Sequence, residues 1–362
     1  MDLYSEMLLE YLRRENHTLS VEMFRLRLKK RVGILTRSND SISDRLIGRH
    51  VDYPRALRRI GGGADLYHVI DQSYAASINV LSRTPTVVTC HDLDAFSPLT
   101  LRNSSAASIL LGPLAKRTLR GLTAATHVVC VSCSVQRDLV ARGWQAEERT
   151  SVIPNGVDPH CSPVPSPLAD CAVGELLPFD SPPVLMHVGS TIQRKRIDIL
   201  LEAFKMVSRQ RPGARLIKAG GAFTAKQKET IERLGLDSSI TVLPFMDRPT
   251  IAAFYRRADI VLLPSEREGF GLPIIEAMAC GTPVLASDIE VLREVGGSAA
   301  SYAPCGKAQD WGTAILCLLD ERDNHAERWS RRIQLGLTHA RQYSWADHAR
   351  RLAQLYHTLI NQ

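Results

Sequence analysis

The feature of this chain that most constrains its fold is an apolar run that leads into closely spaced glycines and a proline. Residues 258–263 are predominantly apolar and end at Pro264, a pattern typical of a parallel strand buried on both faces. Gly269 and Gly271 follow, and glycine allows backbone angles and close approach that a side chain would forbid. The sequence therefore predicts a strand that continues through a glycine loop.

A helix is predicted directly after this loop. Pro273 suits the first turn of a helix, because its missing amide proton would have no partner there. Residues 274–278 are mostly apolar, and Gly281 marks the expected end of the helix. The helix N-terminus then presents unpaired amides and a positive dipole end beside the glycine loop. We predict an anion site here, most naturally for phosphate.

Two carboxylates bracket the loop: Glu268 precedes it and Glu276 lies one turn inside the helix. A carboxylate can accept two hydrogen bonds from a vicinal diol such as a ribose, so Glu276 beside a phosphate site suggests a nucleotide. The alternative is a glutamate that only favours the helix dipole and binds nothing, because strand-loop-helix units are common in α/β proteins.

The run Glu268-Gly-Phe-Gly-Leu-Pro-x-x-Glu-Ala-Met-Ala-x-Gly-x-Pro-Val284 resembles the signature of family 4 glycosyltransferases. These are retaining enzymes of the GT-B architecture that use nucleotide-sugar donors. The resemblance extends over most of the chain and implies an α/β fold with two Rossmann-like, doubly wound domains facing a central cleft. It implies that the C-terminal domain holds the donor through Gly189, Ser190, Gly269, Phe270, Gly271, Leu272 and Glu276, with Glu268 and the loop amides positioning the sugar.

A histidine is expected at the carboxyl end of a strand in the first half of the chain. Residues 85–90 read as a strand that ends at His91, and open α/β sheets bind ligands at that end. A histidine there can hydrogen-bond a sugar hydroxyl or a diphosphate oxygen, although a lone histidine is more often structural. The family resemblance implies a histidine at this point near the transferred sugar, and we therefore assign His91 a catalytic role.

A basic triplet, Arg194-Lys195-Arg196, follows the predicted strand 183–189 and precedes the predicted helix 197–209. Such charges at the ligand-binding edge could neutralise a diphosphate, and the alternative is a solvated loop. The resemblance implies that Lys195 contacts the donor diphosphate and helps it leave, with Arg194 as a common neighbour. Some family members carry another basic residue directly after the glycine. Here that residue is Ser190, so the second contact must come from Arg194 or be missing.

Proline density and the predicted elements divide the chain. Seven of the nineteen prolines lie between residues 159 and 183, which predicts a linker. We expect an N-terminal acceptor-binding domain at residues 1–165 and a C-terminal nucleotide-sugar-binding domain at 178–344. By resemblance, the closing helix 345–359 packs back on the first domain.

The start of the chain departs from the family pattern. Residues 1–14 read as an amphipathic helix, where a Rossmann-like domain should begin with a strand and a glycine loop. A further strand is expected at residues 32–36. Either translation begins upstream, or the N-terminal domain lacks its first strand.

Composition limits the partners and the compartment. The net charge of +7 favours an anionic partner, which could be nucleotide phosphates, acidic lipids or nucleic acid. Residues 24–31 alternate apolar and basic side chains and could lie against anionic lipid, with a solvated basic face as an equal alternative. Nucleic acid is disfavoured, because no binding motif accompanies the charge. Without an apolar run of about 18 residues or a signal peptide, we expect a cytoplasmic protein, peripheral on the inner face of the plasma membrane.

Metal and redox chemistry are not expected. Cys130 and Cys133 form one CxxC, but a zinc site needs a second pair, and the eight cysteines read mostly as buried free thiols. Asp92 and Asp94 spell a DxD that we attribute to chance. No Gly-x-Gly-x-x-Gly follows a predicted strand, which argues against a nicotinamide-dependent dehydrogenase. We therefore predict no metal and no other cofactor.

These observations together predict a retaining glycosyltransferase that moves a hexose-type sugar from a nucleotide-diphosphate donor. Its acceptor would be a glycan, a lipid-linked molecule or a small molecule, as in polysaccharide biosynthesis. A catalytically silent homologue that binds nucleotide and acts as a scaffold is the main alternative, and a GT-B sugar epimerase would share the fold and the donor site. The sequence reveals neither the base nor the sugar nor the acceptor.

Overall fold

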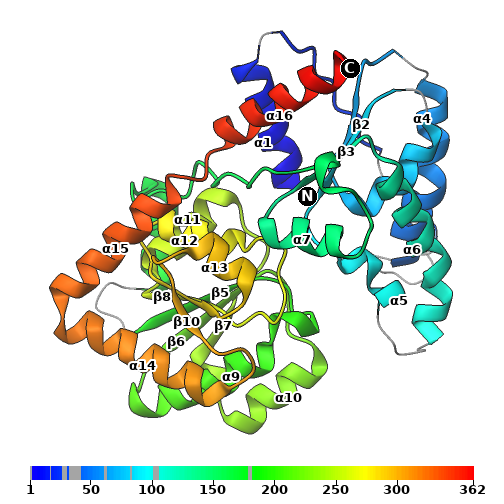
Figure 1. Cartoon of the computed structure of the whole chain (residues 1–362). Coiled ribbons are helices and arrows are strands. Elements are labelled where there is room, and N and C mark those ends of the chain that lie inside the picture. Colours follow the sequence, from blue (N-terminus) through cyan, green and yellow to red (C-terminus); the bar gives the residue numbers. More distant parts are fainter. Residues whose placement is uncertain are drawn as a thin grey trace. The chain divides into compact units, whose positions relative to one another are not determined.

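The computed structural model describes residues 2–16, 18–26, 31, 42–60, 63–81, 84–100, 106–177 and 182–362. The chain divides into two compact units (Figure 1). The first unit comprises Met1–Asn155 and Trp345–Gln362, and the second comprises Gly156–Ser344. Each unit contains one parallel sheet covered by helices, which confirms the predicted pair of Rossmann-like domains.

The described residues of the first unit form a four-stranded parallel sheet in the order β1-β2-β3-β4. Its strands are β1 (Tyr67–Val69), β2 (Thr86–Cys90), β3 (His127–Cys130) and β4 (Thr150–Val152). The helical elements of this unit are α1 (Asp2–Glu15), α3 (Ile42–Ile47), the π-helical turn η1 (Gly48–Asp52), α4 (Tyr53–Ile60), the 3-10 helices η2 (Gln72–Val80), η3 (Asp94–Phe96) and η4 (Glu147–Arg149), α5 (Ser97–Thr100), α6 (Ala106–Ala124), α7 (Cys133–Ala141) and α16 (Trp345–Ile360).

Strand side chains of the first unit alternate between two apolar cores. Val87 and Val129 pack with α1 and α16, so the first and last helices of the chain lie side by side (Figure 1). Val88 and Val128 point the other way, into a core closed by η2, α6 and α7. The helix expected at residues 1–14 is therefore present as α1. The strand expected at residues 32–36 lies outside the described residues.

The described residues of the second unit form a six-stranded parallel sheet in the order β10-β9-β8-β5-β6-β7. Its strands are β5 (Val184–Val188), β6 (Arg215–Ala219), β7 (Ile240–Val242), β8 (Ile260–Leu263), β9 (Val284–Ser287) and β10 (Ser301–Ala303). The chain starts in the middle at β5, builds outward to β7, and then returns to add β8 on the other side. This order is doubly wound, and its direction switches between β5 and β8.

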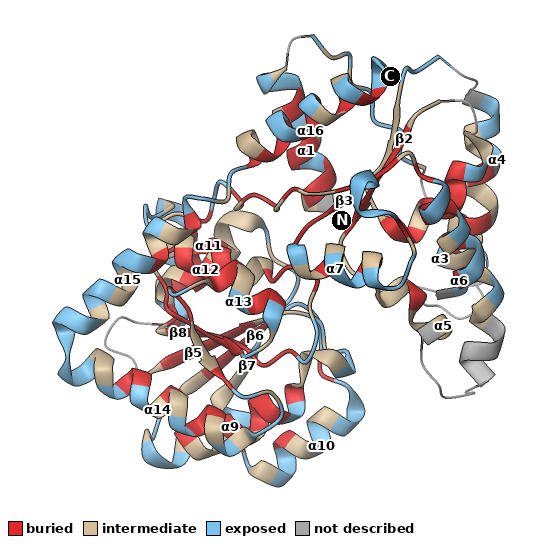
Figure 2. Ribbon diagram, in the orientation of Figure 1, coloured by how far each residue is buried: buried red, intermediate tan, exposed pale blue. Residues whose placement is uncertain are grey.

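Helices cover both faces of this sheet. Leu185, Leu216 and Leu262 belong to a large core that also contains residues of α9 (Ile197–Gln210) and α14 (Ala308–Asn324). Figure 1 shows these two helices beside the sheet, and Figure 2 shows the central strands buried. The helical elements of the second unit are α8 (Pro167–Leu176), η5 (Gln193–Lys195), α9 (Ile197–Gln210), α10 (Ala225–Leu234), η6 (Asp237–Ser239), α11 (Arg248–Arg257), α12 (Leu272–Ala279), α13 (Glu290–Gly296), α14 (Ala308–Asn324) and α15 (Ala326–Ala340).

The boundary between the units corrects the predicted one. The first unit ends at Asn155 and not at residue 165, and the proline-rich stretch belongs to the second unit. Within that stretch, α8 is anchored because Arg256 of α11 pairs with Asp170 at 2.6 Å. Proline density predicted a linker here, but a proline is also well tolerated where α8 begins at Pro167. The closing helix α16 groups with the first unit.

Candidate functional site

The best-formed polar site lies where the second sheet changes direction. β5 and β8 are neighbours, and the loops that leave their carboxyl ends carry the basic triplet and the glycine motif respectively. Ligands of doubly wound sheets bind at such a switch point, because the two loops diverge to opposite faces and leave a crevice. A backbone hydrogen bond from the Glu266 amide to the Arg194 carbonyl, 2.7 Å long, joins the loops.

The glycine loop turns into α12 through a residue that needs glycine. Gly271 is the N-cap of α12 with φ of 97°, and a Cβ there would lie 2.7 Å from Leu292 Cδ2. The backbone angle would strain any residue with a Cβ, and that Cβ would also have to displace the end of the buried Leu292 side chain. α12 begins at Leu272 with Pro273 in its first turn, and its amides open towards the loop as the sequence predicts.

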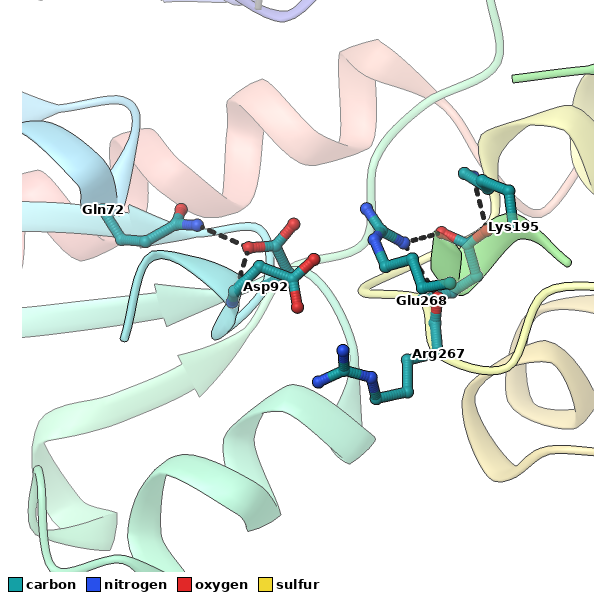
Figure 3. Close-up of polar contacts among 7 residues, drawn as sticks. Gln72, Asp92, Lys195, Arg267 and Glu268 are labelled. Carbon is teal, nitrogen blue, oxygen red and sulfur yellow. Dashed lines mark hydrogen bonds and ion pairs between the residues drawn. The ribbon is translucent and has the colours of Figure 1, made fainter. Parts of the chain in front are cut away.

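Three predicted residues meet across the switch point. Lys195 Nζ lies 2.5 Å from Glu268 Oε1, and Arg194 Nη1 lies 2.9 Å from Glu268 Oε2 (Figure 3). Arg194 also donates to the Arg267 carbonyl at 2.8 Å. The two cations thus share one carboxylate. Both cations belong to η5, and the carboxylate belongs to the loop after β8.

The Glu268 carboxylate is nearly buried, with 7% of its side chain exposed. Burial alone would raise its pKa, but the adjacent Lys195 ammonium and the hydrogen bond from it lower the pKa below the ordinary value. Glu268 is therefore ionised at neutral pH. It holds two cations in place at the ligand-binding edge of the sheet.

The third member of the basic triplet turns elsewhere. Arg196 adopts a left-handed conformation with φ of 48° as the N-cap of α9, and its guanidinium pairs with Asp198 at 2.8 Å. The basic triplet predicted as a unit thus contributes two cations to the pair with Glu268 and one to the start of α9.

Glu276 lies one turn inside α12 beside a buried tyrosine. The hydroxyl of Tyr255, from α11, donates to Glu276 Oε2 at 2.9 Å. Burial raises the pKa of Glu276 to about 7, against the lowering effect of the Tyr255 hydrogen bond, and the negative charge of Asp158 adds to the rise. A carboxylate that is so poorly solvated gains most when a ligand supplies hydrogen-bond donors. Tyr255 carried no sequence signal.

The other residues predicted to bind a donor differ in what they present. Phe270 is buried with its ring 5.8 Å from that of Tyr343, so only its backbone remains for a ligand. Ser190 is exposed, and Gly189 and Leu272 are partly buried. Gly189 and Ser190 follow β5 directly, and Gly269 belongs to the loop after β8.

His91 belongs to the first unit and leaves the carboxyl end of β2. Its Nε2 lies 2.9 Å from the Ile70 carbonyl. Because a carbonyl only accepts, this nitrogen carries the proton and leaves Nδ1 as an acceptor. Burial lowers the pKa of His91, which favours the neutral ring. The predicted cleft in which His91 would meet a donor stays a prediction.

Gln72 fixes the backbone around His91. Its side-chain oxygen accepts from the His91 amide at 2.9 Å, and its Nε2 donates to Asp92 Oδ1 at 3.0 Å (Figure 3). Asp92 also accepts from the Asp94 amide, so the DxD pair forms a local turn. Gln72 is buried at the start of η2, and no sequence pattern marks it as a site residue.

Cysteine placement differs in part from expectation. Cys130 is buried in β3, but Cys133 of the CxxC is exposed at the start of α7. Of the eight cysteines, four are buried, so the expectation that most would be buried was wrong.

Among the described residues, no three His, Cys, Asp or Glu side chains gather as metal ligands would. The described helices are also all too short or too polar to span a membrane.

Two family models match the chain. Residues 3–160 match the model described as Glycosyltransferase Family 4, and residues 174–335 match the model described as Glycosyl transferases group 1. The second match contains the basic triplet, the glycine loop and both glutamates, and the first contains His91.

Two relatives share one description. The D-inositol 3-phosphate glycosyltransferase of Segniliparus rotundus is 32% identical over 289 residues, which are 76% of this chain and 61% of that protein. The protein of the same name from Nocardia farcinica is 30% identical over 286 residues, with the same two shares. This chain thus matches about three fifths of the length of these relatives.

Solved structures agree in fold. Sucrose-phosphate synthase from Thermosynechococcus elongatus superposes with a TM-score of 0.76 at 21% identity, covering 99% of this chain and 93% of that one. HepE from Anabaena, solved in complex with UDP and glucose, gives a TM-score of 0.70 at 21% identity, covering 88% and 84%. At this identity the likeness is one of fold.

Proposed function

This chain belongs to the GT-B glycosyltransferases that carry a family 4 domain followed by a group 1 domain, and we propose that it is a retaining hexosyltransferase. The donor would be a nucleotide-diphosphate sugar bound by the second unit. The observation that carries the proposal is the arrangement at the switch point of that sheet. There Lys195 and Arg194 share Glu268 beside the N-terminus of α12, with Glu276 one turn further on.

The charges of this site suit a departing diphosphate. Negative charge builds up on the diphosphate as the glycosidic bond breaks, and fixed cations and helix amides stabilise that charge more in the transition state than in the ground state. Lys195 and Arg194 would turn from Glu268 towards the diphosphate, or be shared between them. These protein cations would balance the charge, so we propose that no metal ion or other cofactor takes part.

The carboxylates have separate roles in this proposal. Glu276 would accept hydrogen bonds from the ribose diol, and Glu268 with the loop amides would orient the sugar. The two would not act as the acid and nucleophile of a hydrolase. In retaining transfer, the acceptor would attack on the face of the leaving group while a diphosphate oxygen takes its proton. His91 Nδ1, as an acceptor, suits a sugar hydroxyl.

Relatives narrow the choice of substrates to test. HepE was solved with UDP-glucose, and the relatives named above are described as acting on D-inositol 3-phosphate. We therefore propose UDP-glucose as the first donor and an inositol phosphate as the first small-molecule acceptor. Glycan and lipid-linked acceptors at an anionic membrane surface follow from the basic character of the chain.

A donor panel tests the proposal. UDP-, GDP- and ADP-sugars are scored for thermal stabilisation and for slow hydrolysis to the free diphosphate, with and without candidate acceptors. One donor that both stabilises and turns over supports a transferase. Binding without turnover under all conditions favours the silent scaffold, and conversion of the donor sugar without release of diphosphate favours an epimerase. No binding of any donor refutes the proposal.

A further inference from the structure

A lysine of the second unit is completely buried beneath the switch point. Lys218 is the fourth residue of β6, with no exposed surface. Its ammonium donates to the carbonyls of Gly189 at 2.6 Å, of Ala219 at 2.9 Å and of Gly221 at 3.3 Å. All three acceptors are backbone atoms. Among the described residues, the charged group that acts on it is the Lys195 ammonium and not a carboxylate, so its charge is hydrogen-bonded but not neutralised.

The charges around Lys218 leave an excess of positive charge. Burial lowers the pKa of Lys218 to about 8, and the nearby Lys195 ammonium lowers it further. Lys195 has Glu268 as its counter-ion, and that single carboxylate also serves Arg194. An unpaired buried cation is unfavourable in an empty site and favourable in a site that receives an anion.

A buried histidine lies beside this lysine. His187 of β5 is in register with Lys218 of β6. Its Nδ1 lies 2.9 Å from the Leu262 carbonyl, so Nδ1 carries the proton, while Nε2 has no hydrogen-bond partner. A Cβ on Gly189 would lie 3.3 Å from that Nε2 and 3.5 Å from Lys195 Cε. The buried side chains of Lys218 and His187 therefore both lie against Gly189.

The Gly189 peptide connects Lys218 to the ligand edge. The Gly189 amide donates to the Ala219 carbonyl at 3.0 Å and its carbonyl accepts from Lys218, so both of its backbone groups are fixed by the end of β6. Gly220 makes room for this contact, because a Cβ there would lie 2.7 Å from the Gly189 oxygen. An ammonium on a carbonyl polarises the whole peptide and strengthens the N–H at its other end, which is that of Ser190.

We propose that Lys218 is a positioning residue for the donor diphosphate, which fixes and polarises the Gly189–Ser190 peptide and supplies a buried positive charge behind it. This inference rests on the proposed function. Ser190 is neutral and exposed, so its own side chain brings no charge to the diphosphate. Lys218 thus provides positive potential at the buried carbonyl end of this peptide. A basic side chain at position 190 would provide it at the exposed end.

The test compares three variants with the wild type. Lys218→Met removes the charge and keeps an unbranched apolar side chain, whereas Lys218→Arg retains the charge. In the third variant, Ser190→Lys is added to Lys218→Met, which returns a cation to the other end of the same peptide. Isothermal titration with UDP, GDP and ADP, and with the matching nucleosides, reports on the diphosphate separately from the base and ribose.

We expect Lys218→Met to weaken diphosphate binding roughly tenfold or more while leaving nucleoside binding unchanged, the size typical of a hydrogen bond to a charged group. Added Ser190→Lys should recover most of this loss. Melting temperatures show whether each variant is folded, and a role limited to stability predicts no recovery by the added lysine. Equal losses for diphosphate and nucleoside, or full diphosphate affinity in Lys218→Met, would overturn the inference.

The pH profile gives an independent readout. The groups that face Lys218 are Lys195 of η5 and His187 of β5, with Glu268 beyond them. The anion favours protonated Lys218, so wild-type affinity for the diphosphate should fall as pH rises from 8 to 10, and Lys218→Met should lose this fall. An identical profile in both proteins overturns the inference. A wild type that binds none of the three diphosphates refutes the proposed function itself.

Discussion

Replacement of Glu276 by glutamine should make the protein more stable and its nucleotide site weaker. Burial raises the pKa of Glu276 from 4.5 to about 7, and each pKa unit corresponds to about 1.4 kcal/mol. Between these two pH values the unfolded chain has lost this proton and the folded chain keeps it. The folded state therefore loses stability as pH rises through this window, by about 3 kcal/mol in total, and the loss is complete above pH 7.

Glutamine removes this pH-dependent loss but preserves the contact, because its side-chain oxygen can still accept from Tyr255. The Glu276→Gln variant should thus gain about 3 kcal/mol over the wild type at pH 8 and less than about 1 kcal/mol at pH 5. For a unit of this size, the gain at pH 8 corresponds to a rise in Tm of roughly 6–12 °C. Affinity for a nucleoside diphosphate should fall at the same time, because an amide is a weaker acceptor for a ribose diol than a carboxylate is.

The assay is thermal unfolding at pH 5 and pH 8, combined with titration of UDP, GDP and ADP. Glu232→Gln, on the exposed face of α10, is the matched control and should change neither quantity. A variant with no gain in Tm at pH 8, or with the same gain at both pH values, would show that the carboxylate is not desolvated. Unchanged nucleotide affinity in Glu276→Gln and in Glu276→Ala would remove the ribose assignment.

Three further changes test other parts of the structure. Lys195→Ala should lower kcat roughly a hundredfold and diphosphate affinity much less, because the lysine charge matters most as the leaving group departs. Equal losses in kcat, from steady-state kinetics, and in diphosphate affinity would contradict this. Gly271→Ala should lower the unfolding free energy by more than about 2 kcal/mol in urea titrations. The control Gly235→Ala, also at positive φ but in open space, should lower it by only about 1 kcal/mol. Equal effects would exclude a contribution from the contact with Leu292. Gln72→Leu releases the His91 amide and should reduce transfer while leaving nucleoside diphosphate titrations unchanged, and a matching loss of binding would refute a role confined to His91.

The sequence predicted β5 and β8 of the second sheet well because each is a nearly continuous apolar run closed by glycine or proline. The expected strands at 183–189 and 258–263 became β5 and β8, and the helix after the glycine loop ends at Ala279, just before Gly281. These signals are local: each depends on side chains within a few residues of one another. The short strand β10 was not predicted, because it has only three residues, two partly buried and one buried, which are too few to show a period.

Contacts between segments that are far apart in the sequence could not be predicted from local sequence patterns. Tyr255 and Glu276 are on different helices, and only the fold brings the hydroxyl to the carboxylate. Lys218 did leave a trace, since a lysine interrupts an otherwise apolar strand that ends in two glycines. The predicted domain boundary was wrong for a related reason. The prediction used the prolines of residues 159–183. It could not detect the ion pair between Asp170 and Arg256 that fixes α8 to the second unit.

The charges of the second unit explain how the proposed donor site would remain folded without a nucleotide and still favour one. Glu268 holds Lys195 and Arg194, so those cations stay ordered at the edge of the sheet. Glu276 and Lys218, in contrast, each carry a pKa shifted by burial towards their uncharged forms. In the proposed function, a nucleoside diphosphate would bring diol donors to Glu276 and negative charge to Lys218, which would reverse both shifts. Stability that the folded protein gives up at these two residues would then contribute to its affinity for the nucleotide.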